Sequence, residues 1–264
     1  TLQVVARLQR LRQFKQKDLI MRLILLLFLL LAGSSTAFAL SMFSIEHKDA
    51  SYDVVLLEKG EEQQLGLYWK RPDGTAYGTI QALRDDLEKA GKKLLFATNG
   101  GIYSKSFTPL GLYIENGKRY YRLNRGDGGG NFFLLPNGVF FITEKGAAVV
   151  DTRDYNPKQK VLHAIQSGPL LVRNGHLHPR FIESSASLYV RNGVGVDREG
   201  RVVFAISDMP VNFHDFATLF RDRLDAPNAL YLDGSISAMY APELNRYGGW
   251  GIHTYTSIIG LVGR

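Results

Sequence analysis

Residues 229–240 combine residue types that suit chemistry on a small polar substrate. The apolar run 229–232 ends on the carboxylate Asp233, and glycine and hydroxyl-bearing residues follow it. A carboxylate at the exposed end of a buried strand is held rigidly, and the adjacent Gly234 permits close approach of a substrate or of another backbone. The same letters also describe an ordinary Asp-Gly-Ser turn. Asp233 is therefore a candidate site residue, with a plain turn as the alternative.

A second aspartate, Asp208, ends the strand-like run 201–207. Apolar residues at helical spacing follow in residues 213–224, with Asn212 as candidate N-cap, and the chain then returns to the strand before Asp233. A strand, a helix and a further strand form a crossover, so we expect the two strands to be parallel and both aspartates to lie at one sheet edge. Substrate sites favour that edge.

Two glycine-containing turns and one arginine complete the set of candidate residues. Gly100 and Gly101 follow a buried strand that ends at Asn99, and paired glycines allow amide hydrogens to converge on an anion or a sugar oxygen. A hairpin turn is the alternative there, and the Ser-Gly-Pro sequence at residues 167–169 is equally consistent with a strand break. Arg191 lies among apolar neighbours and needs a carboxylate or a bound anion as partner.

The elements that must position these residues are mostly strands. One amphipathic helix is expected over residues 80–90, and a clear hairpin turns at Asn137-Gly138. The other expected strands cover residues 52–57, 64–69, 111–114, 120–123 and 252–262. Without an internal repeat or a linker, the sequence predicts an α+β fold, namely a sheet-rich single domain over residues 40–264 with a mixed β-sheet and a few helices.

The N-terminal region has the layout of a secretory signal peptide. Met21 and Arg22 precede the apolar run 23–32, and the small residues Ala37 and Ala39 mark a cleavage site. The apolar core is too short to span a bilayer comfortably, although an uncleaved anchor is the alternative. We therefore interpret residues 1–39 as an upstream extension and a signal peptide, and we expect a periplasmic or secreted protein with no stable membrane span after cleavage.

Charge, cysteine and histidine content exclude several classes of function. The chain carries +7, of which +5 falls in residues 1–39, so the remainder carries +2 and a nucleic-acid partner is not expected. The absence of cysteine excludes disulfides and thiol chemistry. The six histidines form no familiar metal motif, so no cofactor or metal is expected, and an oxygen-ligand cation at Asp127, Asp208 or Asp233 is the alternative.

Taken together and in order, five segments resemble the phosphodiester glycosidase family. The resemblance extends from about residue 94 to the C-terminus and is greatest with the exported bacterial branch. The segments are Asn99-Gly100-Gly101, Ser167-Gly168-Pro169, residues 191–197, residues 206–208 and Leu232-Asp233-Gly234-Ser235.

The resemblance implies hydrolysis of a sugar-1-phosphodiester at the anomeric carbon, releasing the sugar and a phosphomonoester. It makes Asp233 the nucleophile or the base for water, and Asp208 a residue that positions the sugar or shares the proton transfer. Arg191 is then expected to clamp the phosphate, together with the Gly100 and Gly101 amides. The remaining expected substrate contacts are Asn99, Ser167, Gly168, Gly234, Ser235 and Ser237.

One departure from the family pattern bears on the substrate rather than on the fold. The family aspartate is usually followed by three glycines and a serine, whereas Ile236 interrupts this run here. A β-branched residue does not easily take the left-handed backbone that a glycine allows. The expected partner is a small molecule or an envelope glycan that carries a phosphodiester. The alternatives are a non-catalytic periplasmic glycan-binding protein on the same fold and an envelope assembly partner with an exposed apolar patch.

Overall fold

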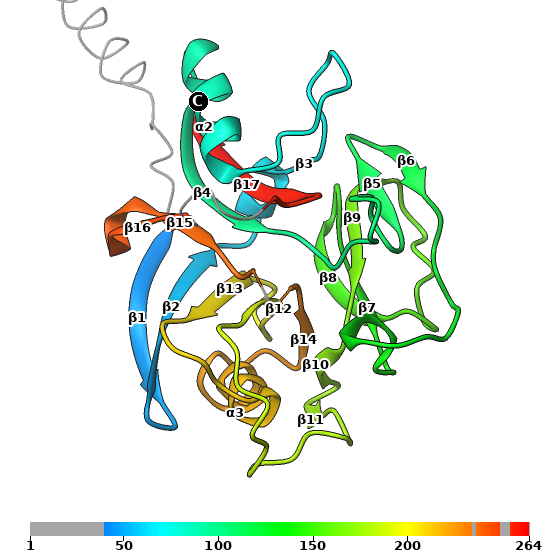
Figure 1. Cartoon of the computed structure of the whole chain (residues 1–264), viewed down its shortest axis with the longest axis vertical. Helices are drawn as coiled ribbons and strands as arrows, with labels where there is room; N and C mark the ends of the chain where they lie inside the picture. Colours follow the sequence, from blue (N-terminus) through cyan, green and yellow to red (C-terminus); the bar gives the residue numbers. More distant parts are fainter. Residues whose placement is uncertain (1–39, 234–235, 249–253, 264) are drawn as a thin grey trace, which may run out of the picture. The chain divides into compact units, whose positions relative to one another are not determined.

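Three β-sheets form the framework of residues 40–233, 236–248 and 254–263, which are the residues that the computed structural model describes. The seven-stranded sheet contains the strands next to Asp208 and Asp233 (Figure 1). Its order is β1 (Ser41–His47), β2 (Ala50–Leu57), β13 (Val202–Ser207), β12 (Asn192–Val196), β14 (Asn228–Tyr231), β10 (Leu170–Arg173) and β11 (His176–Leu177).

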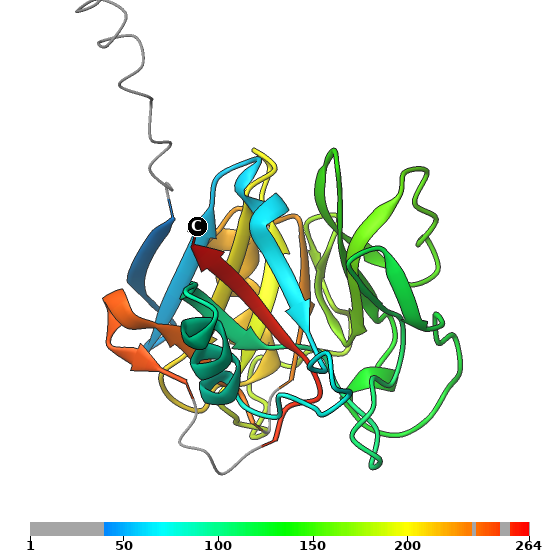
Figure 2. The ribbon, with the colours of Figure 1, turned by 90° about the horizontal axis from the view of Figure 1, so that it is seen from above.

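The other two sheets have five strands each among the described residues (Figure 2). One has the order β16 (Arg246–Tyr247), β15 (Met239–Ala241), β4 (Lys93–Asn99), β17 (Ile258–Gly263) and β3 (Leu65–Tyr68). The other has the order β6 (Lys118–Tyr121), β5 (Tyr113–Glu115), β9 (Val161–Ser167), β7 (Gly138–Thr143) and β8 (Gly146–Asp151).

Helices cover the sheets locally. The α-helices are α2 (Ile80–Lys89) and α3 (Phe213–Thr218), and α3 continues into a π-helical turn, η3 (Leu219–Arg223). Short 3-10 turns are η1 (Glu61–Gln64), η2 (Asn131–Phe133) and η4 (Pro242–Leu244). The predicted helix over residues 80–90 is confirmed as α2, which buries Ile80 and Leu83 against Leu94 of β4.

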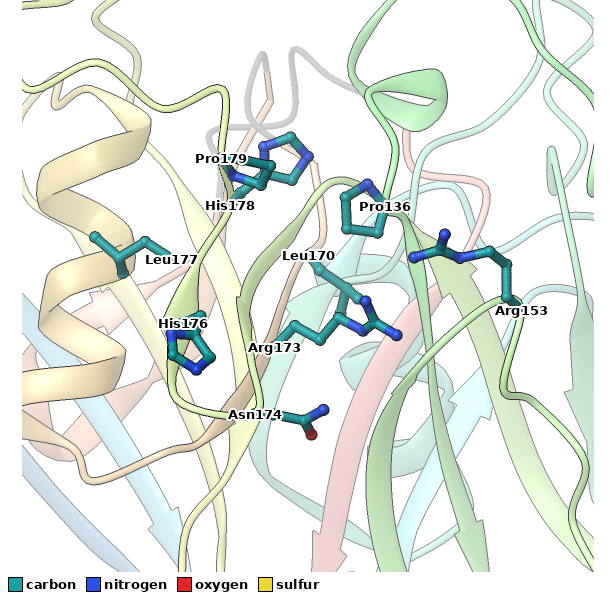
Figure 3. Close-up of a pocket in the computed structure, with 9 residues that line it drawn as sticks. All are labelled: Pro136, Arg153, Leu170, Arg173, Asn174, His176, Leu177, His178 and Pro179. Carbon is teal, nitrogen blue, oxygen red and sulfur yellow. The ribbon is translucent and has the colours of Figure 1, made fainter.

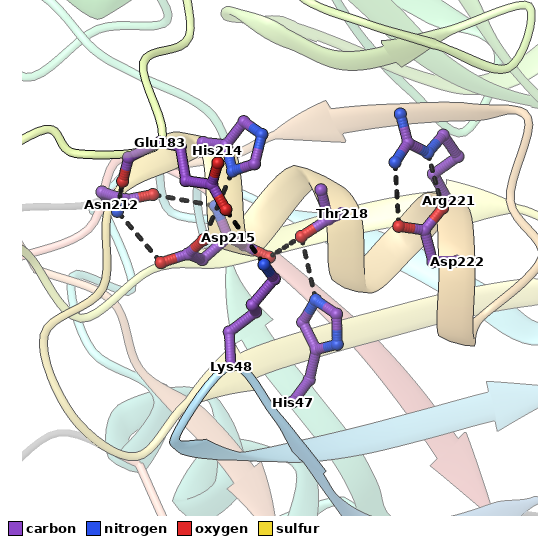
Figure 4. A network of polar contacts seen from close by, with 9 residues as sticks. All are labelled: His47, Lys48, Glu183, Asn212, His214, Asp215, Thr218, Arg221 and Asp222. Atoms are coloured by element: carbon purple, nitrogen blue, oxygen red, sulfur yellow. Dashed lines mark hydrogen bonds and ion pairs between the residues drawn. The ribbon is translucent and has the colours of Figure 1, made fainter.

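The start of α3 is fixed by the N-cap that the sequence predicts. Asn212 Oδ1 accepts a hydrogen bond of 2.8 Å from the Asp215 N–H, as an N-cap should. The β1–β2 hairpin contacts α3 through His47 and Thr218 at 2.9 Å, and it contacts the segment between β11 and β12 through Lys48 and Glu183 at 3.0 Å (Figure 4). Asn212 Nδ2 donates to the Glu183 carbonyl at 2.9 Å, which links that segment to the start of α3. These contacts hold α3 against one face of the seven-stranded sheet.

The core lies where the three sheets meet, at Phe204 of β13. Its ring centroid is 4.9 Å from that of Phe96 in β4 and 6.1 Å from that of Phe140 in β7. Strand β13 is buried on both faces, because Phe204 points into this core and Val203 and Ala205 pack on the α3 side. Such a strand holds the residues at its end firmly in place.

The sheet-rich α+β class is confirmed, but the expected mixed sheet is not found among the described strands. Every ladder between those strands is antiparallel. Strands β13 and β14 do run parallel to each other, but β12 lies between them and is antiparallel to both. The crossover through α3 therefore skips one strand position. The boundary at residue 39 stays a prediction, since residues 1–39 lie outside the described residues.

Acid is expected to destabilise the fold through His163 of β9. Burial lowers the pKa of His163 to about 4, and its Nδ1 accepts the Asn116 N–H at 3.4 Å, which requires a neutral ring. In the unfolded chain the pKa is about 6.5, so the unfolded state binds more protons between pH 6.5 and pH 4. The unfolding free energy should therefore fall by up to about 3 kcal/mol as the pH drops through this window.

Urea unfolding of the wild type and of His163→Gln across pH 4 to 7 tests this expectation. The variant should lose that part of the pH dependence, whereas an unchanged pH profile would show that another group is responsible.

Candidate active site

Asn192, the first residue of β12, joins strand ends from two different sheets. It is buried, and its Nδ2 donates hydrogen bonds to Thr98 Oγ1 at 2.8 Å and to Asn99 Oδ1 at 3.0 Å. Its Oδ1 accepts a hydrogen bond from the Asp233 N–H at 3.1 Å. The end of β4 and the end of β14 are therefore connected through one side chain.

Asp233 is fixed through its backbone on both sides. Its N–H is bonded to Asn192, and its carbonyl oxygen accepts a hydrogen bond of 2.5 Å from Ser237 Oγ. The residue is nearly buried, at 8% exposure. These backbone contacts fix the position of Asp233 at the end of the strand.

The amide of Asn99 has one hydrogen-bonding group that the described residues do not satisfy. Its Oδ1 accepts from the Ala238 N–H at 2.8 Å and from Asn192 Nδ2, which fixes the orientation of the amide. Its Nδ2 is buried and has no acceptor among the described residues. A buried donor without a partner costs about 1–3 kcal/mol. Asn99 is thus well suited to meet an oxygen of a bound ligand.

Ser167 connects this network to the loop after β4. Its Oγ donates to the Leu232 carbonyl at 2.6 Å and accepts from the Ile102 N–H at 3.3 Å. Ser167 has no exposed surface. The sequence predicted that this hydroxyl contacts the substrate. In the structure it bonds to Ile102 and to Leu232, and it thereby holds the loop after β4 next to the residue that precedes Asp233.

The predicted glycines are required mainly by close packing of strands. A Cβ at Gly100 would overlap Ser257 Oγ, and one at Gly101 would lie 2.9 Å from the Gln166 carbonyl oxygen. The Gly100 N–H donates to the Ser257 carbonyl at 2.8 Å, so it is not available to a phosphate. A Cβ at Gly168 would likewise lie 2.7 Å from Asn137 Cβ.

Arg191 is enclosed and has a structural role. The residue is 0% exposed, and its guanidinium donates to the carbonyls of Val211 at 2.8 Å and Ser187 at 2.9 Å. It also lies 3.3 Å from Tyr231 Oη and 3.6 Å from the ring centroid of Phe213, and burial lowers its pKa. We expected a phosphate clamp here. The partners are instead backbone carbonyls and aromatic rings, so we leave Arg191 out of the proposed phosphate contacts.

Asp208 lies at the same sheet edge as Asp233, but β12 separates the two strands. Their backbones are therefore about two strand spacings, roughly 10 Å, apart. Asp208 is exposed, and its N–H donates to the Ser51 carbonyl at 3.0 Å, on the side of the sheet away from β14. The two carboxylates are not immediate neighbours. The predicted contacts Gly234 and Ser235 lie outside the described residues.

Two tyrosines near Asp233 were not predicted from the sequence. Burial, followed by the negative charge of Asp233, raises the pKa of Tyr103, and the same two causes raise that of Tyr255 to about 12. Both hydroxyls therefore remain protonated donors at neutral pH. Tyr103 follows the Gly100-Gly101 pair by two residues, which is a usable signal, whereas nothing in the sequence marks Tyr255 or the role of Asn192.

A cavity elsewhere on the described surface contains none of the predicted site residues. It has a volume of about 400 Å³, and Arg153 and Arg173 lie at its rim (Figure 3). Both arginines are paired with the buried Asp151, at 2.6 Å and 3.2 Å. The described residues also contain no group of three or more histidine, aspartate or glutamate side chains placed to hold a metal ion.

Comparison with known proteins identifies the class of this chain. Residues 92–257 match the family described as phosphodiester glycosidase. An uncharacterized protein of Escherichia coli (strain K12), YigE, is 41% identical over 180 residues, which are 68% of this chain and 70% of that protein. This chain therefore belongs to the phosphodiester glycosidase family, a class of hydrolases of phosphodiester-linked sugars, and the resemblance noted from the sequence is confirmed.

One solved structure supports the same fold. The catalytic domain of zebrafish N-acetylglucosamine-1-phosphodiester alpha-N-acetylglucosaminidase, auto-inhibited by its pro-peptide, matches with a TM-score of 0.60 and 17% identity, over 88% of this chain and 86% of that one. A hypothetical protein from Synechocystis gives a TM-score of 0.48 and 14% identity, over 85% of this chain and 62% of that one. Among the described residues, no helix is long and apolar enough to cross a membrane.

Proposed function

We propose that this protein hydrolyses a sugar-1-phosphodiester at the anomeric carbon. The observation that carries the proposal is the position of Asp233, a nearly buried residue just beyond the end of β14 whose backbone is fixed by Asn192 and Ser237. The position falls inside the segment that matches the phosphodiester glycosidase family. A carboxylate in a fixed position suits a nucleophile or a general base.

The proposed reaction needs one firmly positioned carboxylate and does not require a second carboxylate as a strong general acid. Water, or Asp233 itself followed by water, forms the new bond to the anomeric carbon. The bond from that carbon to the phosphate oxygen breaks, and its electrons leave with the phosphomonoester. In the direct route Asp233 takes the proton from the attacking water. In the two-step route water displaces Asp233 from the anomeric carbon, the carboxylate leaves with the bonding electrons, and the proton of the water passes to solvent. Because a phosphomonoester is a good leaving group, strong general acid assistance is not needed, which fits the separation of Asp208 from Asp233 by β12.

Contacts to the sugar and the phosphate come from neutral donors in this proposal. Tyr103 and Tyr255 supply hydroxyl donors in the surroundings of Asp233, and Asn99 supplies a buried amide donor. Fixed donors of this kind stabilise charge on a leaving group without reorganisation. Asp208 remains the residue proposed to position the sugar, and the Gly101 amide and the unplaced Gly234 and Ser235 remain proposed phosphate contacts.

We further propose that the protein acts outside the cytoplasm. The support is the signal-peptide layout from Met21 to Ala39. A periplasmic or secreted location would place the enzyme where envelope glycans with phosphodiester links are found.

Sugar release from a panel of sugar-1-phosphodiesters tests the proposed activity. The panel should vary the sugar and the alcohol, with the matching methyl glycosides and sugar-1-phosphates as controls. We expect free sugar and a phosphomonoester in equal amounts from at least one diester, and no release from the methyl glycosides. Saturable binding of the diesters without any turnover would instead indicate the glycan-binding alternative.

A further inference from the structure

Phe107 exposes a large aromatic ring from an unusual backbone conformation. The residue is 52% exposed and has a φ of +54°. For a bulky side chain this region is rarely populated and costs of order 1–3 kcal/mol. An exposed ring gains little from burial in return. The conformation therefore calls for a reason other than the stability of the fold.

The loop that carries Phe107 is closed by its own hydrogen bonds. Ser104 and Thr108 are joined by a backbone bond of 2.8 Å and by their hydroxyls, also at 2.8 Å. The Phe107 N–H donates to the Ser104 carbonyl at 3.0 Å, and Tyr103 pairs with Pro109 across the base. The position of the ring is thus set by a defined turn.

The ring of Phe107 stacks on a second aromatic ring, that of Tyr103, which lies near the candidate active site. Phe107 and Tyr103 are stacked, with centroids 5.4 Å apart and an angle of 22° between their planes. The base of the loop is tied to the end of β14, since Ile102 is bonded to Ser167 and Ser167 to the Leu232 carbonyl. Leu232 immediately precedes Asp233, so the base of the loop lies beside the candidate catalytic residue, and the charge of Asp233 contributes to raising the pKa of Tyr103.

We propose that the exposed ring of Phe107, supported by the stacked ring of Tyr103, is the platform on which the apolar C–H face of the substrate's pyranose ring packs. The inference rests on the proposed function and adds to it the element that binds the sugar. A pyranose buries its C–H face well on a flat aromatic surface, because that face is apolar while its hydroxyls point outward. The closed turn keeps the surface in place before the sugar binds, which reduces the entropy lost on binding.

Replacing Phe107 with asparagine tests the platform without disturbing the turn. Asparagine tolerates a positive φ better than other residues, so the variant removes the ring and keeps the backbone. We expect KM for the phosphodiester substrate to rise about tenfold with kcat nearly unchanged, as for the loss of about 1.4 kcal/mol of binding. Phe107→Tyr should restore the wild-type KM. Phe43→Ala, which removes another exposed ring, 38% exposed and on β1, serves as the control and should have no effect.

Two further readouts separate failure of the platform from failure of the proposed function. Saturation-transfer NMR with simple methyl pyranosides should show contact at the ring protons for the wild type and not for Phe107→Asn, whether or not any diester is cleaved. Unchanged KM and unchanged NMR contacts in Phe107→Asn would overturn the platform while leaving the hydrolase intact. A thermal midpoint lowered by several degrees in the variant would also overturn it, because the ring would then be structural.

Discussion

Asp233→Asn is expected to lower kcat on a sugar-1-phosphodiester by about 10²- to 10⁴-fold, the range that a positioned acid–base group contributes. The fold should be retained, because the bonds from Asn192 and Ser237 are made to the backbone of Asp233 and persist in the variant. The substitution is close to isosteric, so the loss should appear in kcat more than in KM. Single-turnover rates measure the loss in the chemical step, and thermal unfolding measures the stability of the fold.

Asp208→Asn is the matched control for this experiment. It changes the same functional group at the same sheet edge, but on a strand separated from β14 by β12. We expect a clearly smaller loss, and Asp233→Ala should behave like Asp233→Asn. If Asp233→Asn kept more than a tenth of the wild-type rate, the central assignment would be wrong. An equal loss in both asparagine variants would point to a two-carboxylate mechanism.

Asn192→Ala is expected to lower the unfolding free energy by about 3 kcal/mol and to reduce activity as well. The substitution leaves the buried Asp233 N–H without its acceptor and Thr98 and Asn99 without their donor. Each unsatisfied buried group costs about 1–3 kcal/mol. The activity should fall because the backbone of Asp233 is no longer held at a fixed position. Urea unfolding and kcat for the same preparation measure both effects.

Thr98→Val separates the two halves of this network. It removes the hydroxyl that accepts from Asn192, but it leaves the bond between Asn192 and Asp233 in place. We expect it to cost stability while largely preserving kcat in the folded protein. An Asn192→Ala variant within 0.5 kcal/mol of the wild type, a difference typical of surface substitutions, would contradict the assigned role.

Features set by neighbouring residues were predicted well. The N-cap at Asn212 and the extent of α2 follow from side chains within one or two turns, so the local pattern contains them. Strand order depends on distant segments, and no local pattern shows that β12 inserts between β13 and β14. The expectation that Asp208 and Asp233 follow parallel strands at one sheet edge was correct. The distance between them could not be derived from the sequence, because it depends on the strand order.

For the site residues, too, local features were predicted and contacts between distant segments were not. The sequence indicated that Arg191 needs partners, but a lone arginine in an apolar strand does not reveal whether these are an anion, carbonyls or rings. Gly100 and Gly101 were interpreted through backbone freedom, whereas close strand packing explains them. The role of Asn192 was not predicted, because its hydrogen bonds join Thr98 and Asp233, which lie far apart in the sequence.

Strand β4, which ends at Asn99, pairs with segments that come much later in the chain. Strand β4 pairs with β15 and β17, both of which come from the last 26 residues of the 264-residue chain. A polypeptide still emerging from the ribosome or from a secretion channel therefore lacks the neighbours that β4 needs. The strand that carries Asn99 can therefore complete its pairing only when the residues from Met239 onward are available to it.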